Sequence, residues 1–246
     1  MYKSEIVFES SPTQAKLEEL LETNLEIIKD IAAEKHVNPV SLANEIWPLY
    51  YMANPNLCED TIKDSIQYAQ FYHKDQWRDS GNPFILHPLQ VSYFMAFNQM
   101  PDEPVQGGLL HDVKEKNSDK WHMLGNSIYS RFGELVSLYV SAMSTKNKPK
   151  NNDIDTATLE KKQRITDFSQ KFGLDCMIVL KLGDNIMNMR SRKYLPAKYG
   201  MDAKEFQNSQ LNASKKHYRP LAKEIDGLRM LPMEITPYLD KVYKKY

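Results

Sequence analysis

The sequence predicts an all-α fold. Apolar residues recur three or four positions apart along most of the chain, as Ile62, Ile66 and Ala69 do, and this spacing places them on one helix face. Only nine of the 246 residues are glycines, which disfavours a β-rich fold with many tight turns. The sequence shows no internal repeat and no Gly-rich phosphate-binding loop. The core is therefore expected to consist of packed helices.

Prolines and loop residues mark where the helices begin and break. The first helix is expected over residues 11–36, where Pro12 suits the first turn. The second is expected over 40–52, with a disturbance at Pro48. The stretch "GNP" at 81–83 has loop chemistry and separates the third helix from the fourth. The helices expected after the second cover residues 59–74, 86–99, 103–116, 121–131, 133–144, 156–172, 174–191 and 203–229, and a short helix follows near the C-terminus.

The chain is expected to form one main domain with an added layer. Residues 1–55 are interpreted as an N-terminal helical extension and residues 56–246 as the main domain. Between two expected helices, the polar stretch "TKNKPKNNDID" at 145–155 lacks periodicity and is expected to be a surface loop.

Composition excludes several classes of protein. Lys plus Arg equals Asp plus Glu at 32 each, so no net charge draws the chain to nucleic acid or to anionic lipid. No apolar run reaches the roughly 18 residues that a membrane span needs, and the N-terminus lacks the apolar core of a signal peptide. A cytoplasmic location is therefore expected. The two cysteines, Cys58 and Cys176, are expected to be buried thiols rather than a disulfide pair.

Metal-type ligands interrupt three apolar stretches. His111 and Asp112 are adjacent in "GLLHDVKEKN", His87 lies in "PFILHPLQV", and Asp184 lies in "MIVLKLGDNIMNMR". A buried carboxylate must be paired, hydrogen-bonded or bound to a metal. Two imidazoles and two carboxylates suit Mn²⁺, Fe²⁺ or Co²⁺ with open positions for water better than a closed Zn²⁺ site. Glu115 should share a helix face with His111 and Asp112.

Simpler explanations exist for each residue taken alone. A lone His in an apolar stretch, such as His87, is more often a core residue with a satisfied hydrogen bond than a ligand. Asp184 could instead be paired with Lys181, three residues earlier on the same helix. The prediction of a metal site therefore depends on the ordered set rather than on any single residue.

The ordered set resembles a known family. "HKDQWRDSGNPFILHPLQV" (73–91), "LLHDVKEKN" (109–117) and "VLKLGDNIMNMRS" (179–191) are similar, in order, to the motifs of the RelA/SpoT-type HD-domain hydrolases, and "HYRPLA" (217–222) is similar to a later helix. The resemblance covers about residues 65–232. It implies the all-helical HD-domain fold, with residues 56–246 as a phosphohydrolase-like domain. With no synthetase-like domain following, the chain looks like a small stand-alone alarmone hydrolase, similar to the metazoan SpoT homologues.

The resemblance also implies a reaction and roles for individual residues. The family removes pyrophosphate from the 3′ position of (p)ppGpp with Mn²⁺, giving GDP or GTP, so the expected partner is a small-molecule nucleotide. Glu115 matches the residue that orients or activates the attacking water. The matches to the family's metal ligands are His87, His111, Asp112 and Asp184, and those to its substrate-binding residues are Arg78, Ser80, Asn188 and Ser191, with Asn188 also beside the reacting groups.

Two positions depart from the family pattern, and both reverse a charge. Lys116 follows Glu115 where the family has Asp, and Asp79 follows Arg78 where it often has Lys. Lys116 is expected to be one of the catalytic residues, with Glu115 and Asn188. It could pair with Glu115 or Asp112, which would slow the chemistry, or attract the departing pyrophosphate; the first is the favoured hypothesis. The alternatives are a hydrolase of another phosphorylated nucleotide such as NADPH, or a nucleotide-binding sensor with weak catalysis.

Overall fold

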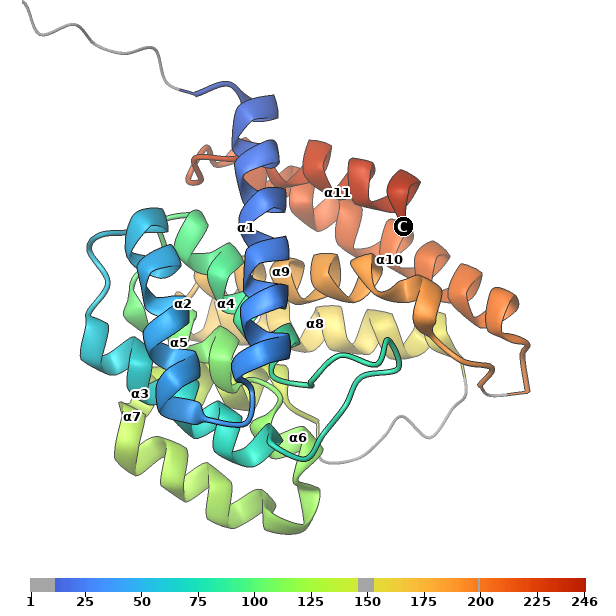
Figure 1. Cartoon of the computed structure of the whole chain (residues 1–246). Coiled ribbons are helices and arrows are strands. Elements are labelled where there is room, and N and C mark those ends of the chain that lie inside the picture. The colour runs from blue at the N-terminus through green and yellow to red at the C-terminus, as the bar shows by residue number, and fades with distance from the viewer. Residues whose placement is uncertain (1–11, 146–152, 199) are drawn as a thin grey trace, which may run out of the picture.

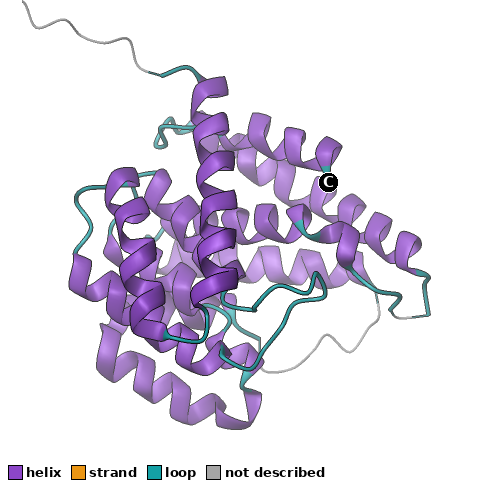
Figure 2. Cartoon of the chain, in the orientation of Figure 1, coloured by secondary structure: helices purple, strands orange, loops and turns teal. Residues whose placement is uncertain are grey.

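The computed structural model of this chain describes residues 12–145, 153–198 and 200–246. The described residues form helices joined by loops and contain no β-strand, only the isolated bridges Trp77–Pro83 and Lys198–Met201 (Figure 2). The prediction of an all-α fold is confirmed. The elements, arranged as in Figure 1, are α1 (Gln14–Lys35), α2 (Pro39–Ala53), α3 (Glu59–His73), α4 (Leu86–Phe97), α5 (Asp102–Leu110), α6 (Val113–Lys116), η1 (Ser118–Lys120), α7 (Trp121–Met143), α8 (Ile154–Phe172), α9 (Cys176–Arg190), η2 (Arg192–Tyr194), α10 (Ala203–Gly227) and α11 (Ile235–Lys245).

The expected order of helices is observed, with two differences in continuity. The helix expected over 103–116 is broken at His111 and Asp112 into α5 and α6. The disturbance expected at Pro48 does not end α2, which continues through it. Pro48 and Asn44, whose carbonyl loses its partner, are both exposed, so water can satisfy that carbonyl.

Two further expectations concern α7 and the loop after it. The break expected between 121–131 and 133–144 is observed, because the backbone of Gly133 (φ 86°, ψ 177°) is not helical and divides α7 (Trp121–Met143) at a kink. Most of the loop expected over 145–155 lies outside the described residues, and α8 begins at Ile154.

Two helices form the centre of the molecule. All residues of α4 except Gln90 are buried, as are most residues of α9, whereas α1, α10 and α11 bury fewer than half of theirs. The two helices pack against each other, and α1, α5, α10 and α11 surround them. Polar side chains on α4 and α9 are therefore held in fixed positions by close-packed surroundings.

The N-terminal helices share this core. Leu21, Leu25 and Ile28 of α1 are fully buried and belong to the same hydrophobic cluster as the residues of α4 and α9. The expected division of the chain near residue 55 stays a prediction about its organisation.

The cysteines are free thiols, but one expectation about them was wrong. Cys176 is half-buried, whereas Cys58 is exposed because it precedes the first residue of α3 at the surface. Among the described helices, none combines the length and the apolar character that crossing a membrane requires.

Adjacent glycines in α5 allow it to approach its neighbours closely. A Cβ atom on Gly108 would lie 2.9 Å from the Cα of Ser92 in α4, and one on Gly107 would lie 2.7 Å from the Cβ of Tyr139 in α7. Real Cβ atoms do not occur at such distances, so α5 can occupy its place only with glycine at both positions. This close packing brings the end of α5, with His111, near the start of α4, with His87.

We expect Gly108→Ala to lower the free energy of unfolding by about 1–3 kcal/mol, because the added methyl group meets the backbone of α4 and forces the helices apart. Urea denaturation followed by circular dichroism measures the change. Gly227→Ala is the matched control, since no atom lies within 4 Å of its Cβ position, and it should be nearly neutral. Equal destabilisation by both substitutions would contradict the close α4–α5 packing.

Candidate active site

His87 and Asp184 meet between the two central helices. His87 lies in the first turn of α4 and Asp184 in the middle of α9, and both are buried. The Nε2 atom of His87 lies 3.1 Å from Oδ1 of Asp184. Burial lowers the pKa of His87 to about 4, with the charge of Arg78 acting in the same direction. The imidazole is therefore neutral at physiological pH and can act as a ligand.

His111 and Asp112 occupy the turn between α5 and α6. Nδ1 of His111 lies 2.8 Å from the carbonyl oxygen of Gly108, so Nδ1 carries the proton and Nε2 has a free lone pair. This Nε2 lies 3.5 Å from Oδ2 of Asp112 and 3.8 Å from Oδ1 of Asp184. The break in the helix turns both side chains towards α4 and α9, an arrangement that a continuous helix would not give.

The four residues fit a divalent metal ion. One ligand atom each from His87, His111 and Asp184 lie within 4.8 Å of one another, and Oδ2 of Asp112 lies 3.9 Å from Nε2 of His87. Nε2 of His111 is buried and has no hydrogen-bond partner among the described residues, a costly state unless another group binds it. Two imidazoles and two carboxylates can together supply the nitrogen and oxygen ligands and balance a double positive charge.

The carboxylates of this group are held in their ionised forms. Burial raises the pKa of Asp112, but the neighbouring His111, His87 and Lys116 outweigh it and bring the pKa to about 2. At so low a pH the imidazole of His87 is itself protonated and contributes its charge. Burial likewise raises the pKa of Asp184, but the charge of Lys181 and the hydrogen bond with His87 hold it well below its usual range. Metal ligands must be deprotonated, so both carboxylates are ready to bind a cation.

Lys181 and Asn188 orient the Asp184 carboxylate. The Nζ atom of buried Lys181 lies 2.6 Å from Oδ2, and Nδ2 of Asn188 donates to Oδ1 at 2.7 Å. Oδ1 is also the oxygen that faces the two imidazoles. The simpler explanation, a Lys181–Asp184 pair, therefore describes one oxygen of the carboxylate, while the other remains directed at the metal-type ligands.

Glu115 and Lys116 point in different directions from α6. Oε2 of Glu115 accepts hydrogen bonds from the backbone N (3.3 Å) and the Oγ1 (3.1 Å) of Thr145. The Nζ atom of Lys116 lies 5.0 Å from the centroid of the Phe84 ring. The expected ion pair with Glu115 or Asp112 is absent, since no carboxylate of the described residues lies within 4 Å of Lys116. Neighbouring residues on a helical turn diverge by about 100°, so Lys116 faces the loop before α4 instead.

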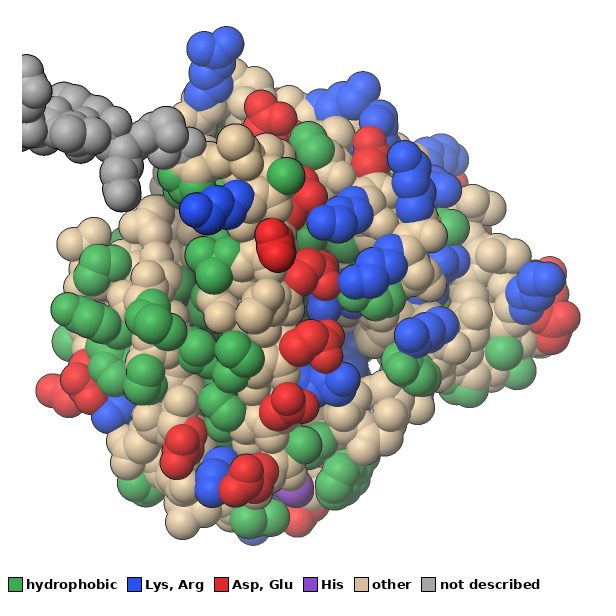
Figure 3. Space-filling model, turned by 45° about the horizontal axis from the view of Figure 1, so that its top comes forward, with side chains coloured by type: hydrophobic (Ala, Val, Ile, Leu, Met, Phe, Trp, Pro, Cys, Tyr) green, Lys and Arg blue, Asp and Glu red, His purple; other side chains and the backbone are tan. Residues whose placement is uncertain are grey.

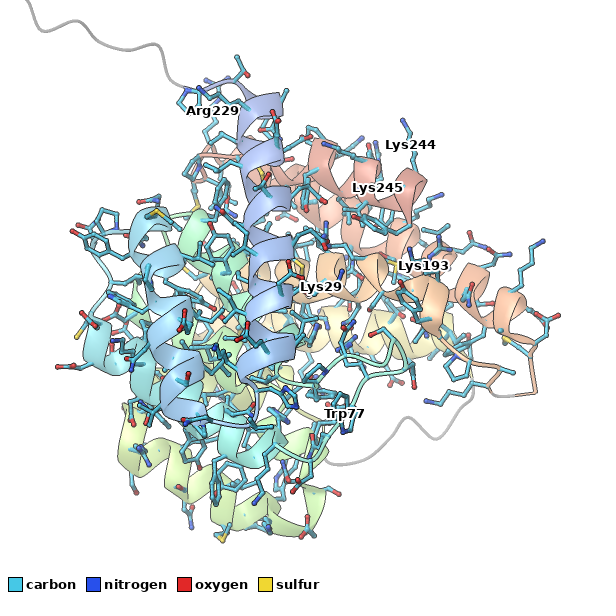
Figure 4. The ribbon with its side chains drawn as sticks, viewed as in Figure 1. Lys29, Trp77, Lys193, Arg229, Lys244 and Lys245 are labelled. Carbon is cyan, nitrogen blue, oxygen red and sulfur yellow. The ribbon has the colours of Figure 1, made fainter. Side chains whose placement is uncertain are left out.

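The nucleotide-binding candidates cluster around Arg78. Its Nη2 donates to Oδ1 of Asn188 and to Oγ of Ser191, both at 3.2 Å, and its guanidinium lies 5.7 Å from the centre of the Phe84 ring. Burial lowers the pKa of Arg78, although nearby carboxylates oppose the shift. Ser80 accepts a hydrogen bond from Asn82 in the same loop. This loop joins α3 to α4, and the side chain of Trp77 projects from it (Figure 4).

One pocket of about 310 Å³ brings all of these candidates together. Four cations and four carboxylates line it, so its formal charge is balanced before a metal is counted. Sequence reasoning gave no role to Trp77 and Phe84, although both lie in the quoted stretch 73–91, and it missed Lys161, which no motif marks. The sequence-predicted residues in its lining are Arg78, Ser80, His87, His111, Asp112, Glu115, Lys116, Asp184, Asn188 and Ser191.

A second cavity of about 520 Å³ adjoins this pocket between α8, α9 and α10. Both cavities are lined by Arg78, Asn188, Lys161 and Lys181. Tyr218, from the stretch "HYRPLA", lines the second cavity, whereas its neighbour His217 bonds Asp155 at 2.7 Å. The pocket therefore has room beside it for the rest of a nucleotide.

We expect Lys181→Met to weaken binding of a divalent metal about 10- to 100-fold, because it removes the group that orients Asp184. Titration of the protein with Mn²⁺, followed by calorimetry, measures the affinity. Lys171→Met, at an exposed position of α8, is the control and should bind the metal as the unchanged protein does. Unchanged affinity in Lys181→Met would show that Asp184 needs no such support.

Comparison with known proteins supports this reading of the site. Residues 65–222 match the family model described as "HD domain". The GTP pyrophosphokinase of Streptomyces antibioticus is 29% identical over 174 residues, which are 71% of this chain and 19% of that protein. The guanosine-3′,5′-bis(diphosphate) 3′-pyrophosphohydrolase of Borreliella burgdorferi is 30% identical over 151 residues (56% of this chain, 21% of that protein). The bifunctional (p)ppGpp synthase/hydrolase SpoT of Escherichia coli is 32% identical over 139 residues (55% and 19%).

The chain spans about a fifth of the length of these relatives. The matched region, residues 65–222, contains all four metal-type ligands and the Arg78 loop. The resemblance to the RelA/SpoT-type proteins is confirmed, and the chain belongs to the HD-domain family.

Proposed function

We propose that this protein is a metal-dependent pyrophosphohydrolase that removes the 3′-pyrophosphate of (p)ppGpp to give GDP or GTP. The observation that carries the proposal is one pocket lined by both the metal-type ligands and the Arg78–Asn188–Ser191 cluster. Relatives named as 3′-pyrophosphohydrolases of this nucleotide match 56% and 57% of the chain. The expected cytoplasmic location stays a prediction.

His87, His111, Asp112 and Asp184 would hold the metal, for which we propose Mn²⁺ because equal numbers of imidazoles and carboxylates favour it over structural Zn²⁺. When bound, such an ion lowers the pKa of water and polarises a phosphoryl oxygen. The pocket without metal carries no net formal charge, so a polyanionic substrate gains little attraction from the protein alone. Substrate binding should therefore depend on the metal.

Other side chains of the pocket would transfer the proton and bind the nucleotide. Hydrolysis adds the oxygen of water to the phosphorus next to the 3′ oxygen, breaks that phosphorus–oxygen bond, and leaves a proton on the 3′ oxygen. Glu115, fixed by two hydrogen bonds from Thr145, is placed to take a proton from water. The guanidinium of Arg78 is planar and suited to stacking on a purine. Lys116 and Lys161, both in the pocket lining, offer positive charge to the phosphates.

A larger phosphorylated nucleotide such as NADPH is the second candidate substrate. The adjoining cavity of about 520 Å³ could accept a second nucleoside. Trp77 lines the catalytic pocket and is 58% exposed, so its ring is available for stacking. With this substrate the metal would act in the same way, and only the part of the nucleotide that binds beside the metal would differ.

A panel of nucleotides with Mn²⁺ tests the function. We expect pyrophosphate release from ppGpp and none after Asp184→Asn, which removes a metal-type carboxylate. Phosphate release from NADPH but no pyrophosphate from ppGpp would favour the second candidate. Saturable binding of ppGpp without release would identify a nucleotide sensor and contradict the proposed enzyme.

A separate prediction concerns Lys116, whose position over Phe84 favours a role in binding phosphate rather than in restraining Glu115. Lys116→Met should raise KM for ppGpp about tenfold, equivalent to roughly 1.4 kcal/mol, and change kcat much less. Steady-state kinetics at saturating Mn²⁺ separate the two constants. Lys120→Met, an exposed lysine of η1, controls for the loss of charge. A higher kcat in Lys116→Met would instead restore the hypothesis that this lysine slows the chemistry.

A further inference from the structure

A third cavity adjoins the catalytic pocket at Arg78 and His87, which line both. Its volume is about 150 Å³, and α1, the loop before α4, the end of α9, η2 and Tyr246 line it. Lys29 reaches it from α1 and Lys193 from η2 (Figure 4). None of the roles assigned above uses these two lysines.

The charge of this cavity differs from that of the catalytic pocket. Lys29, Arg78, Arg190 and Lys193 line it, against the carboxylate of Glu26. Glu22, behind the lining, neutralises Arg190, so the cations still outnumber the carboxylates by two. Figure 3 shows Lys and Arg side chains gathered towards one side of the molecule, away from a region of apolar side chains. A concave site with excess positive charge attracts anions and repels metal ions.

Lys193 is the cation most available to a ligand. Among the described residues, no carboxylate lies within 4 Å of its Nζ atom. Its ammonium lies 5.2 Å from the ring centre of Tyr194 and 5.8 Å from that of Tyr246. Lys29, in contrast, is 3.0 Å from Glu26 on the same helix, an exposed pair that contributes little stability. An incoming anion could therefore engage both lysines at small cost.

Size limits what the cavity can accept. A volume of 150 Å³ corresponds to about five water molecules at roughly 30 Å³ each. Pockets for whole drug-sized ligands are larger, about 300–1,000 Å³. The cavity suits a phosphate or pyrophosphoryl group, while any nucleoside attached to it would have to remain outside.

We propose that this cavity is a second anion site, which binds a phosphate or pyrophosphoryl group without a metal. The group could belong to free inorganic pyrophosphate or to the terminal phosphates of a nucleotide. The site shares Arg78, Ser80, His87, Ser191 and Tyr194 with the catalytic pocket. Arg78 donates hydrogen bonds to Ser191 and Asn188. An anion bound beside the Arg78 guanidinium would therefore lie against the side chains that separate the two cavities.

Calorimetric titration of the full chain with inorganic pyrophosphate, and separately with GTP, tests the proposal. With saturating Mn²⁺ the unchanged protein should bind at least one of these probes at two sites, and without metal only the event at the third cavity should remain. Lys29→Gln/Lys193→Gln should weaken one of the two binding events about tenfold or more and leave the other intact. If the double variant loses affinity for pyrophosphate alone, the ligand of the site is the free anion. If it loses affinity for GTP alone, the ligand is the terminal phosphates of a nucleotide.

Three further variants make the result specific. Lys193→Arg keeps the charge and should retain both events, and Lys223→Gln removes a charge from an exposed position of α10 and should change neither. Lys161→Gln should weaken only the event at the catalytic pocket. The proposal is overturned if the double variant binds both probes as the unchanged protein does, or if Lys161→Gln removes all binding. The assay measures binding, so its outcome is independent of whether the protein hydrolyses ppGpp.

Discussion

The buried carboxylate of Asp184 is the constraint on which the site depends. A charge removed from water costs several kcal/mol unless it is paired and hydrogen-bonded. Here one oxygen is neutralised by Lys181, and the other meets His87 and Asn188. These partners come from both central helices, so the charge fixes the register of α9 against α4. The same arrangement leaves one oxygen facing the imidazoles, where a cation would complete the pairing.

The outer helices support this arrangement at the end of α9. Arg190, the last residue of α9, is buried and forms an ion pair with Glu22 of α1. Its Nη1 also donates to the hydroxyl of Tyr238 in α11, at 3.3 Å, and that hydroxyl donates to Glu22 at 2.7 Å. The N-terminal and C-terminal helices thus hold the backbone just before Ser191, which contacts Arg78. The outer layer therefore contributes to the side of the pocket formed by Arg78 and Ser191, although it supplies no predicted catalytic residue.

The order of the helices, and the motif residues that line the catalytic pocket, could be predicted from the sequence because periodicity and motif order are local signals. The break at His111 and Asp112 could not, since no glycine or proline marks it and the bond from the His111 ring to Gly108 depends on the tertiary fold. Lys161 was missed for a similar reason. It lies in an ordinary amphipathic helix, and only the packing of α8 beside α9 brings it into the pocket. The partner of Lys116 was predicted wrongly because a side chain beside a loop has no helical neighbour to fix its direction.

The two departures from the family pattern are related in the three-dimensional structure. Asp79 and Lys116 are far apart in sequence, yet both line the catalytic pocket. The pattern that this chain resembles has the opposite charges at these positions, so the two reversals cancel and leave the total charge of the pocket unchanged. What changes is the distribution: positive charge moves from the loop beside Arg78 to the turn that bears His111 and Asp112. A phosphate chain is drawn to wherever the positive charge lies. Under the proposed function, the exchange favours a substrate whose phosphates lie close to the metal-type ligands and whose base side tolerates a carboxylate.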